Sequence, residues 1–204
     1  MARRHLAFSA IVLVLLGSTV AYTSQAGANF ASQATGDCYW SYIRECYADS
    51  YVHTWSSQVG PRTHAAIEWS LYNSYDTTDL DIPDNEESHS GSVDIWYHFA
   101  DVAGGVGVSS CQTWTGHVCA HWHVLFDDGD IGNYSNVALI SLACHETGHT
   151  VGLMHQSPAV FDDGNPTNSD DENYRCMVTD SNPQNNSQYV GTHNVGHING
   201  YYSP

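Results

Sequence analysis

The sequence predicts an α+β fold in a single domain. The chain has 204 residues, which suits one or at most two compact domains and is long enough to bury a hydrophobic core. A strand pattern, a helical pattern, several further strand patterns and a second helical pattern follow one another, and a third helical pattern closes the chain after a loop-rich region. No internal repeat is present. We expect the domain to cover residues 38–204, after segments at 1–28 and 29–37.

Residues 1–28 have the pattern of a secretory signal peptide. Arg3 and Arg4 precede an apolar run over 6–16, and small residues follow up to Ala28. The apolar run is shorter than the roughly 20 residues that a membrane-spanning helix needs, so we favour export over a membrane anchor. Cleavage is expected after Ala28, with Ala21 as the alternative, and the next nine residues are then a leader or a short pro-segment. We therefore expect a secreted, extracellular protein.

The chain is strongly acidic. All 22 Asp and Glu residues lie beyond residue 36, whereas two of the five basic residues lie in the signal peptide, so its removal changes the formal net charge from −17 to −19. Such a surface repels nucleic acid and anionic lipid. We therefore expect no nucleic-acid or membrane partner, and we expect a monomer with a solvated acidic surface.

Five segments have the composition of strands, with alternating or β-branched and aromatic residues between turn-forming residues. The last two are separated by a short connection, so we expect them to pair with each other. The predicted strands cover residues 51–56, 78–82, 93–99, 104–111 and 119–127.

Three segments have apolar residues at helical spacing. The first, PRTHAAIEWSLYNS over 61–74, opens with a proline at a position where helices tolerate it. The second starts at 133–136, where NYSN offers capping side chains, and runs through VALISLACHETGHTV to a stop at Gly152. The third, THNVGHINGYY over 192–202, starts at a capping threonine and is weakened by two glycines. Residues 156–186 are predicted to be loops.

The cysteine content predicts three disulfides. The six cysteines all lie beyond the signal peptide, and an even number in an oxidising compartment favours bridges. Zinc ligation by cysteine is the alternative, but the sequence has no C-x-x-C pair. Proximity suggests two pairs and leaves the third, so the predicted bridges are Cys38–Cys46, Cys111–Cys119 and Cys144–Cys176.

The segment CHETGHTVGLMH over 144–155 predicts a zinc site. His145 and His149 are four residues apart, so a helix presents both imidazoles on nearly the same face. Glu146 is about 100° further round the helix, where a carboxylate can reach a water on the metal without being a ligand. Together they satisfy the H-E-x-x-H pattern.

The third histidine of this segment requires the helix to end. A continuous helix would carry His155 roughly 15 Å along the axis from His145, too far for a shared ion bound at about 2.0–2.1 Å. Gly152 lies where the break is needed, since glycine adopts the left-handed conformation at little cost. Three imidazoles then leave a fourth tetrahedral position for water, which is typical of catalytic rather than structural zinc.

The run HETGHTVGLMH over 145–155 resembles the extended signature of the metzincin zinc endopeptidases. That family also has a methionine turn below the zinc, and Met177 is its candidate, because Met1 leaves with the signal peptide and Met154 lies inside the motif. A Cys144–Cys176 bridge would tie the zinc helix to this turn. Within the family, the chain is most similar to the matrix-metalloproteinase-like branch, because FDDGDIGNYS resembles the strand before its zinc helix.

The resemblance implies a twisted mixed β-sheet with an active-site helix and a small irregular C-terminal subdomain that ends in a helix. It also implies that a substrate strand pairs antiparallel with an edge strand above the cleft, for which residues 104–111 are the candidate. The chain departs from the family in having no propeptide of the usual size and no cysteine-switch motif, so latency of that type is not implied.

Further metal sites have weaker signals. Loop carboxylates suggest calcium as an additional ion, but none completes a calcium-loop pattern, and solvated acidic loops are the simpler interpretation. His193 and His197 repeat the four-residue spacing without an acidic neighbour, so we interpret them as packing or capping residues rather than as a second metal site. The carboxylates are those of Asp127, Asp128, Asp130, Asp162, Asp163, Asp170, Asp171 and Glu172.

These features together predict a secreted zinc-dependent endopeptidase that hydrolyses peptide bonds of a protein or peptide substrate. Zinc activates the attacking water, and Glu146 acts as the general base. One alternative is a secreted binding protein that keeps zinc for stability without turnover, although such a protein would have little reason to retain Glu146. Another is a zinc amidase acting on cell-wall or short peptides, which a preference for peptide length would distinguish.

Overall fold

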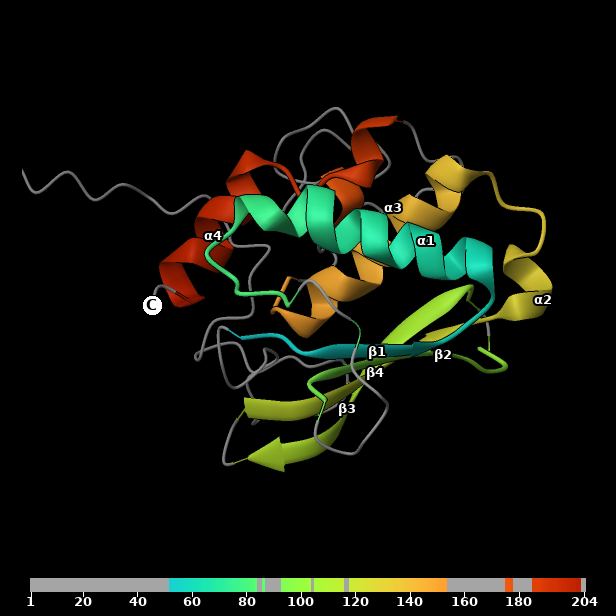
Figure 1. Cartoon of the computed structure of the whole chain (residues 1–204), viewed down its shortest axis with the longest axis horizontal. Helices are drawn as coiled ribbons and strands as arrows, with labels where there is room; N and C mark the ends of the chain where they lie inside the picture. The colour runs from blue at the N-terminus through green and yellow to red at the C-terminus, as the bar shows by residue number, and fades with distance from the viewer. Residues whose placement is uncertain are drawn as a thin grey trace, which may run out of the picture.

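The computed structural model describes residues 52–83, 86, 93–103, 105–115, 118–153, 175–177 and 185–202. Several predicted features lie outside these residues: the signal peptide and leader expected over 1–37, Cys38, Cys46, His155 and most of the loops expected over 156–186. Within them, helices are stacked on one face of a four-stranded sheet, which confirms the predicted α+β class (Figure 1). No helix in the described ranges is long and apolar enough to cross a membrane.

The sheet is mixed and has the strand order β1-β2-β4-β3. Its strands are β1 (Trp55–Gln58), β2 (Ile95–Phe99), β3 (Gly107–Thr115) and β4 (Val118–Phe126). β1, β2 and β4 run parallel, whereas β3 pairs antiparallel with β4 and forms one edge of the described sheet. A disulfide between Cys111 and Cys119 joins these last two strands, as the sequence predicts. β3 starts later than predicted and continues to Thr115.

Two strand predictions need correction. The segment over 51–56 pairs as a strand only from Trp55, since Val52 makes a single isolated bridge to Asp81. The prediction of a strand over 78–82 is wrong, because the bridge at Asp81 is the only described strand pairing in this segment. Local hydrogen bonds take the place of pairing between strands here. The Thr78 hydroxyl donates to the Tyr75 carbonyl at 2.6 Å.

The three predicted helices are confirmed. α1 (Pro61–Trp69) continues into a π-helical turn and a short 3-10 turn that ends at Thr77. α3 (Asn136–Thr150) begins after Ser135, whose hydroxyl accepts a hydrogen bond from Ala138 N at 3.1 Å. α4 (Thr192–Tyr202) closes the described chain.

A short helix, α2 (Asp128–Ile131), was not predicted. The carboxylate of Asp127 accepts hydrogen bonds from the amides of Gly129 and Asp130, which satisfies donors at the helix start. A further hydrogen bond from Val102 N helps to lower the pKa of Asp127. The segment over 126–135 resembles the strand before the zinc helix of the matrix-metalloproteinase-like branch, but only Phe126 belongs to a strand here and residues 128–131 are helical.

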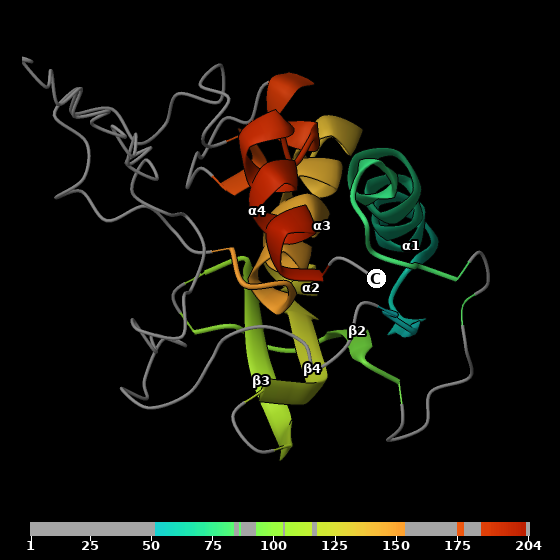
Figure 2. The same cartoon turned by 90° about the vertical axis from the view of Figure 1, so that its left-hand side faces the viewer.

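Helices α1 and α3 lie side by side on the same face of the sheet (Figures 1 and 2). The first core cluster fills the space between them and the strands, and it includes Trp55, Ile67, Leu71, Ile95, Tyr97, Val124, Phe126 and Leu139. The second joins the end of α3 to residues 175–177 and α4, and it includes Cys144, Val151, Leu153, Met177, Val190, Ile198 and Tyr202. Each large apolar side chain so buried stabilises the fold by roughly 1.5–3 kcal/mol. This second cluster fixes the end of α3 on which the candidate site lies.

Candidate metal centre

His145 and His149 lie on the last turns of α3 with their imidazoles facing each other. The two Nε2 atoms are 3.3 Å apart. The ring centroids are 4.8 Å apart and the ring planes are perpendicular at 90°. Two nitrogens bound at 2.0–2.1 Å to one tetrahedral zinc ion are separated by about 3.3 Å, so the pair matches the spacing that zinc requires.

Hydrogen bonds to backbone carbonyls fix the tautomer of both rings. His145 Nδ1 is 2.7 Å from the carbonyl oxygen of Cys176, and His149 Nδ1 is 2.8 Å from that of Leu153. Because a carbonyl only accepts, Nδ1 carries the proton in each ring, and in the neutral ring the Nε2 lone pair points toward the other imidazole. Two lone pairs that converge in this way are stabilised by a cation between them, so the residues fit a metal ion.

The end of α3 supplies one of these carbonyls. Gly152 has a φ of 95°, which lies in the left-handed region that glycine adopts without strain. Leu153 N donates to Gly148 O at 2.8 Å and Gly152 N donates to His149 O at 3.2 Å, the bond pattern of a Schellman motif. The chain therefore reverses after Val151, and the reversal directs the carbonyl of Leu153 back to the His149 ring. The helix stops at the glycine that the sequence indicated.

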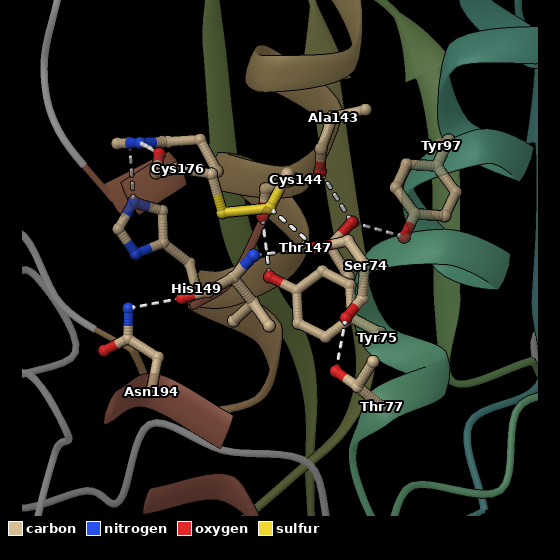
Figure 3. Close-up of a disulfide and its surroundings, with 12 residues drawn as sticks. Ser74, Tyr75, Thr77, Tyr97, Ala143, Cys144, Thr147, His149, Cys176 and Asn194 are labelled. Carbon is tan, nitrogen blue, oxygen red and sulfur yellow. Dashed lines mark hydrogen bonds between the residues drawn. A yellow bond between two sulfur atoms is a disulfide. The ribbon is translucent and has the colours of Figure 1, made fainter. Parts of the chain in front are cut away.

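The other carbonyl comes from the short turn over 175–177, which a disulfide fastens to α3. Cys144 and Cys176 are bridged, as the sequence predicts, and Figure 3 shows the bond beside His149. Arg175, which opens the turn, has a φ of 43°, an uncommon and costly conformation for a residue other than glycine. The disulfide and the hydrogen bond from His145 thus hold the same turn.

Met177, the candidate for the methionine turn, packs directly against α3 at Gly148, which lies between the two histidines in sequence. A Cβ atom added to Gly148 would lie 2.4 Å from Met177 Sδ and 3.1 Å from the Tyr75 hydroxyl. The glycine at this position of the H-E-T-G-H run therefore allows the methionine to reach the helix backbone. Met177 is 1% exposed, so the contact is fully buried.

Two buried tyrosines anchor the same part of α3 (Figure 3). Tyr75 donates a hydrogen bond to Cys144 O at 2.7 Å, and Tyr97 donates to Thr147 Oγ1 at 2.8 Å. The Thr147 hydroxyl in turn donates a hydrogen bond to Ala143 O at 2.7 Å. Burial raises the pKa of both tyrosines, so they remain protonated donors.

Glu146 points to the edge strand. Ser109 Oγ lies 2.8 Å from Glu146 Oε2 and 2.8 Å from Glu146 O. A Cβ atom on Gly107 would lie 2.8 Å from Glu146 Oε1, so only glycine leaves room for the carboxylate. Burial raises the pKa of Glu146 to about 7, and the hydrogen bond from Ser109 opposes the rise. The acid that the sequence singled out thus lies against the edge strand β3.

The third predicted ligand, His155, lies outside the described residues, and so do Cys38 and Cys46. No group of three or more metal-ligating side chains is found in the described part of the chain. The calcium alternative gains no support there, since the Asp127 carboxylate instead caps α2.

Sequence reasoning named residues 104–111 as the candidate edge strand above the cleft, but it missed which residues of that strand and of other elements contact α3. Ser109 and Gly107 lie in a predicted strand, and Tyr75 and Tyr97 are distant from α3 in sequence. No local pattern distinguishes them from ordinary strand or core residues. Only the glycine-rich composition of the segment before Cys111 hinted at a close approach of another group.

No family model matches the sequence, and no curated protein is significantly similar to it. Among the solved structures that resemble the chain are two at low identity. Myroilysin has 14% identity and a TM-score of 0.47, over 78% of this chain and 96% of its own. High choriolytic enzyme 1, a hatching enzyme zinc-protease from Oryzias latipes (Medaka fish), has 12% identity and a TM-score of 0.43, over 77% of this chain and 94% of its own. At these values the likeness assigns no function to this chain.

Proposed function

We propose that the protein is a metzincin-like zinc endopeptidase, with His145, His149 and His155 as zinc ligands and Glu146 as the general base. The observation that carries the proposal is the pair of Nε2 atoms 3.3 Å apart in rings whose Nδ1 atoms are committed to carbonyls. An ordinary packed histidine pair has no need for both Nε2 lone pairs to converge. The proposal stays at the level of the metzincins, without a choice of branch.

The chain length supports His155 as the third ligand. The Leu153 carbonyl is 2.8 Å from the His149 ring, and His155 is two residues further on. Two residues span at most about 7 Å. A link of two residues after the reversal at Gly152 permits the proposed third ligand, whereas a continued helix would carry position 155 away from the ion.

Zinc bound by these imidazoles supplies a Lewis acid that polarises a carbonyl and makes water more acidic. The Glu146 carboxylate takes a proton from the water as its oxygen attacks the scissile carbonyl carbon, and it delivers that proton to the amine as the C–N bond breaks. Ser109 holds one carboxylate oxygen by a hydrogen bond, and the bare backbone at Gly107 gives space to the other. The products are a carboxylate and a protonated amine, because the second proton of the water also goes to the leaving nitrogen.

The edge position of β3 supports an extended peptide as substrate. The outer edge of this strand has no partner strand among the described residues, and an edge strand can pair with an added chain through backbone hydrogen bonds. Gly107 and Ser109, which contact Glu146, belong to this strand. A peptide paired along it would pass close to the base.

Secretion is part of the proposal. The basic and apolar pattern of residues 1–28 supports it, and so do the two described disulfides, which persist in oxidising compartments. A zinc-stabilised binding protein remains the alternative of another class, and a zinc amidase the alternative enzyme. The buried, hydrogen-bonded carboxylate of Glu146 favours turnover over binding alone.

The deciding experiment compares the secreted wild-type chain with Glu146→Ala in the cleavage of unfolded casein. We expect at least a ~100-fold loss of rate, because a general base contributes about 10²–10⁴. Zinc content should not change, since Glu146 is not a ligand. Glu68→Ala, a half-exposed glutamate on α1, is the matched control and should cleave normally. Equal cleavage by wild type and Glu146→Ala would refute the proposed role, and zinc binding without cleavage by wild type would favour the binding protein.

A further inference from the structure

We propose that His193 and His197 on α4 form a second site, for a divalent ion that prefers imidazole. Their Nε2 atoms are 3.1 Å apart, the ring centroids are 4.6 Å apart and the ring planes cross at 81°. The pair on α3 has almost the same geometry, at 3.3 Å, 4.8 Å and 90°. Both pairs therefore converge at the separation that two nitrogens have on one tetrahedral ion.

The packing of α4 holds the two rings at the surface. Asn194, Ile198 and Tyr202 are buried, and the amide of Asn194 donates to Val190 O at 2.8 Å. These contacts fix the rotation of the helix about its axis. His193 and His197 then lie together on a neighbouring face and are partly exposed. These two imidazoles are the ligands that the described residues would supply to the ion.

The helix between the two ligands is intrinsically weak, which gives a bound ion a structural role. Gly196 lies within the turn that the pair spans, and Gly200 follows one turn later. A Cβ atom at either position would meet nothing within 4 Å, so packing does not require glycine there. Glycine lowers the stability of a helix relative to alanine. An ion held by both histidines would clamp the turn that contains Gly196.

The donor set selects the class of ion. Imidazole nitrogen suits zinc, copper and nickel, whereas magnesium and calcium prefer oxygen ligands. The competing explanation is a hydrogen bond between two neutral rings, in which one Nε2 carries a proton. The two explanations differ in measurable metal binding, and neither depends on the proposed peptidase activity.

The experiment counts zinc on the full secreted chain after equilibration with buffered zinc. We compare wild type with the double variant His193→Ala/His197→Ala. The control is His64→Ala, a partly exposed helical histidine with no histidine one turn away. Wild type and control should each bind one zinc more than the double variant, whatever the occupancy of the His145 and His149 pair. Magnesium should not compete. Equal zinc counts in all three proteins would overturn the proposal.

A second variant tests the clamp while keeping both ligands. Gly196→Ala should bind the second zinc as tightly as wild type or up to about fivefold more tightly. The reason is that alanine removes about 1 kcal/mol of helix cost before the ion binds. Weaker binding by Gly196→Ala would show that the ion does not hold a helical turn, and it would overturn the structural role.

Discussion

At the scale of the single residue, Gly107 is decisive because it controls the place of a side chain on another element. An alanine Cβ at this position would lie 2.8 Å from Glu146 Oε1 and 3.1 Å from Glu146 Cγ. Atoms do not approach that closely, so the carboxylate would have to shift away from β3. The Ser109 hydrogen bond on the same strand would be strained by that shift.

Gly107→Ala should therefore lower kcat/KM for casein about 10- to 100-fold, since a misplacement of about 1 Å can cost on the order of 10² in rate. Zinc content and the melting temperature should change little. Gly105→Ala is the matched control, because its added Cβ would meet its nearest atoms at 3.6 and 3.7 Å, an ordinary contact. Full activity in Gly107→Ala would show that the Glu146 carboxylate does not need its described position.

At the scale of the element, α3 and the 175–177 turn act as one unit. The Cys144–Cys176 bridge and the bond from His145 Nδ1 to Cys176 O connect the same two segments. The bridge therefore restrains both the unfolded chain and the orientation of a candidate ligand.

The double variant Cys144→Ala/Cys176→Ala should lower the free energy of unfolding by about 4 kcal/mol on the chain-entropy estimate for its loop. Zinc affinity should fall about 10- to 100-fold, because the Cys176 carbonyl that orients the His145 ring is held less firmly. Cys111→Ala/Cys119→Ala is the control. It closes a shorter loop, should cost about 2.5 kcal/mol and should leave zinc affinity unchanged. Similar zinc affinities for both double variants, measured by competition with a chelator, would contradict the coupling.

Local and non-local forces explain which elements could be predicted. The helices followed from spacing, Pro61, Ser135 and Gly152, all of which act within a few residues. The strand predicted over 78–82 failed because a strand needs a distant partner, and only Asp81 found one. α2 was not predicted because the only residue that indicates its first turn is the capping Asp127, which lies beside other acidic residues.

At the scale of the whole molecule, the proposed zinc ion stabilises the fold because it binds only the folded chain. A ligand that binds only the folded chain stabilises it by mass action, by about 2.7 kcal/mol at a hundredfold excess over Kd. Both described ligands and the proposed third lie within one short stretch of chain. The carbonyls that orient the two described rings come from the 175–177 turn and from the end of α3.

Removal of zinc by a chelator should abolish cleavage and lower the melting temperature by about 5–10 °C for a domain of this size. Glu146→Ala should keep this thermal shift, because its ligands are intact, whereas His149→Ala should lose most of it. Calorimetry with and without added zinc measures both. A chelated protein that still cleaves casein would contradict a zinc-dependent mechanism.

The sequence by itself determined the one-turn spacing of His145 and His149, the helix stop at Gly152 and the cysteine pairs that the two described bridges join. These features depend on helical periodicity and on the conformational freedom of glycine, which act locally. Only the tertiary structure decided that two carbonyls fix the histidine tautomers and that Ser109 and Gly107 receive Glu146. Those contacts depend on sheet register and on the direction of turns, which chain segments far apart in sequence set together.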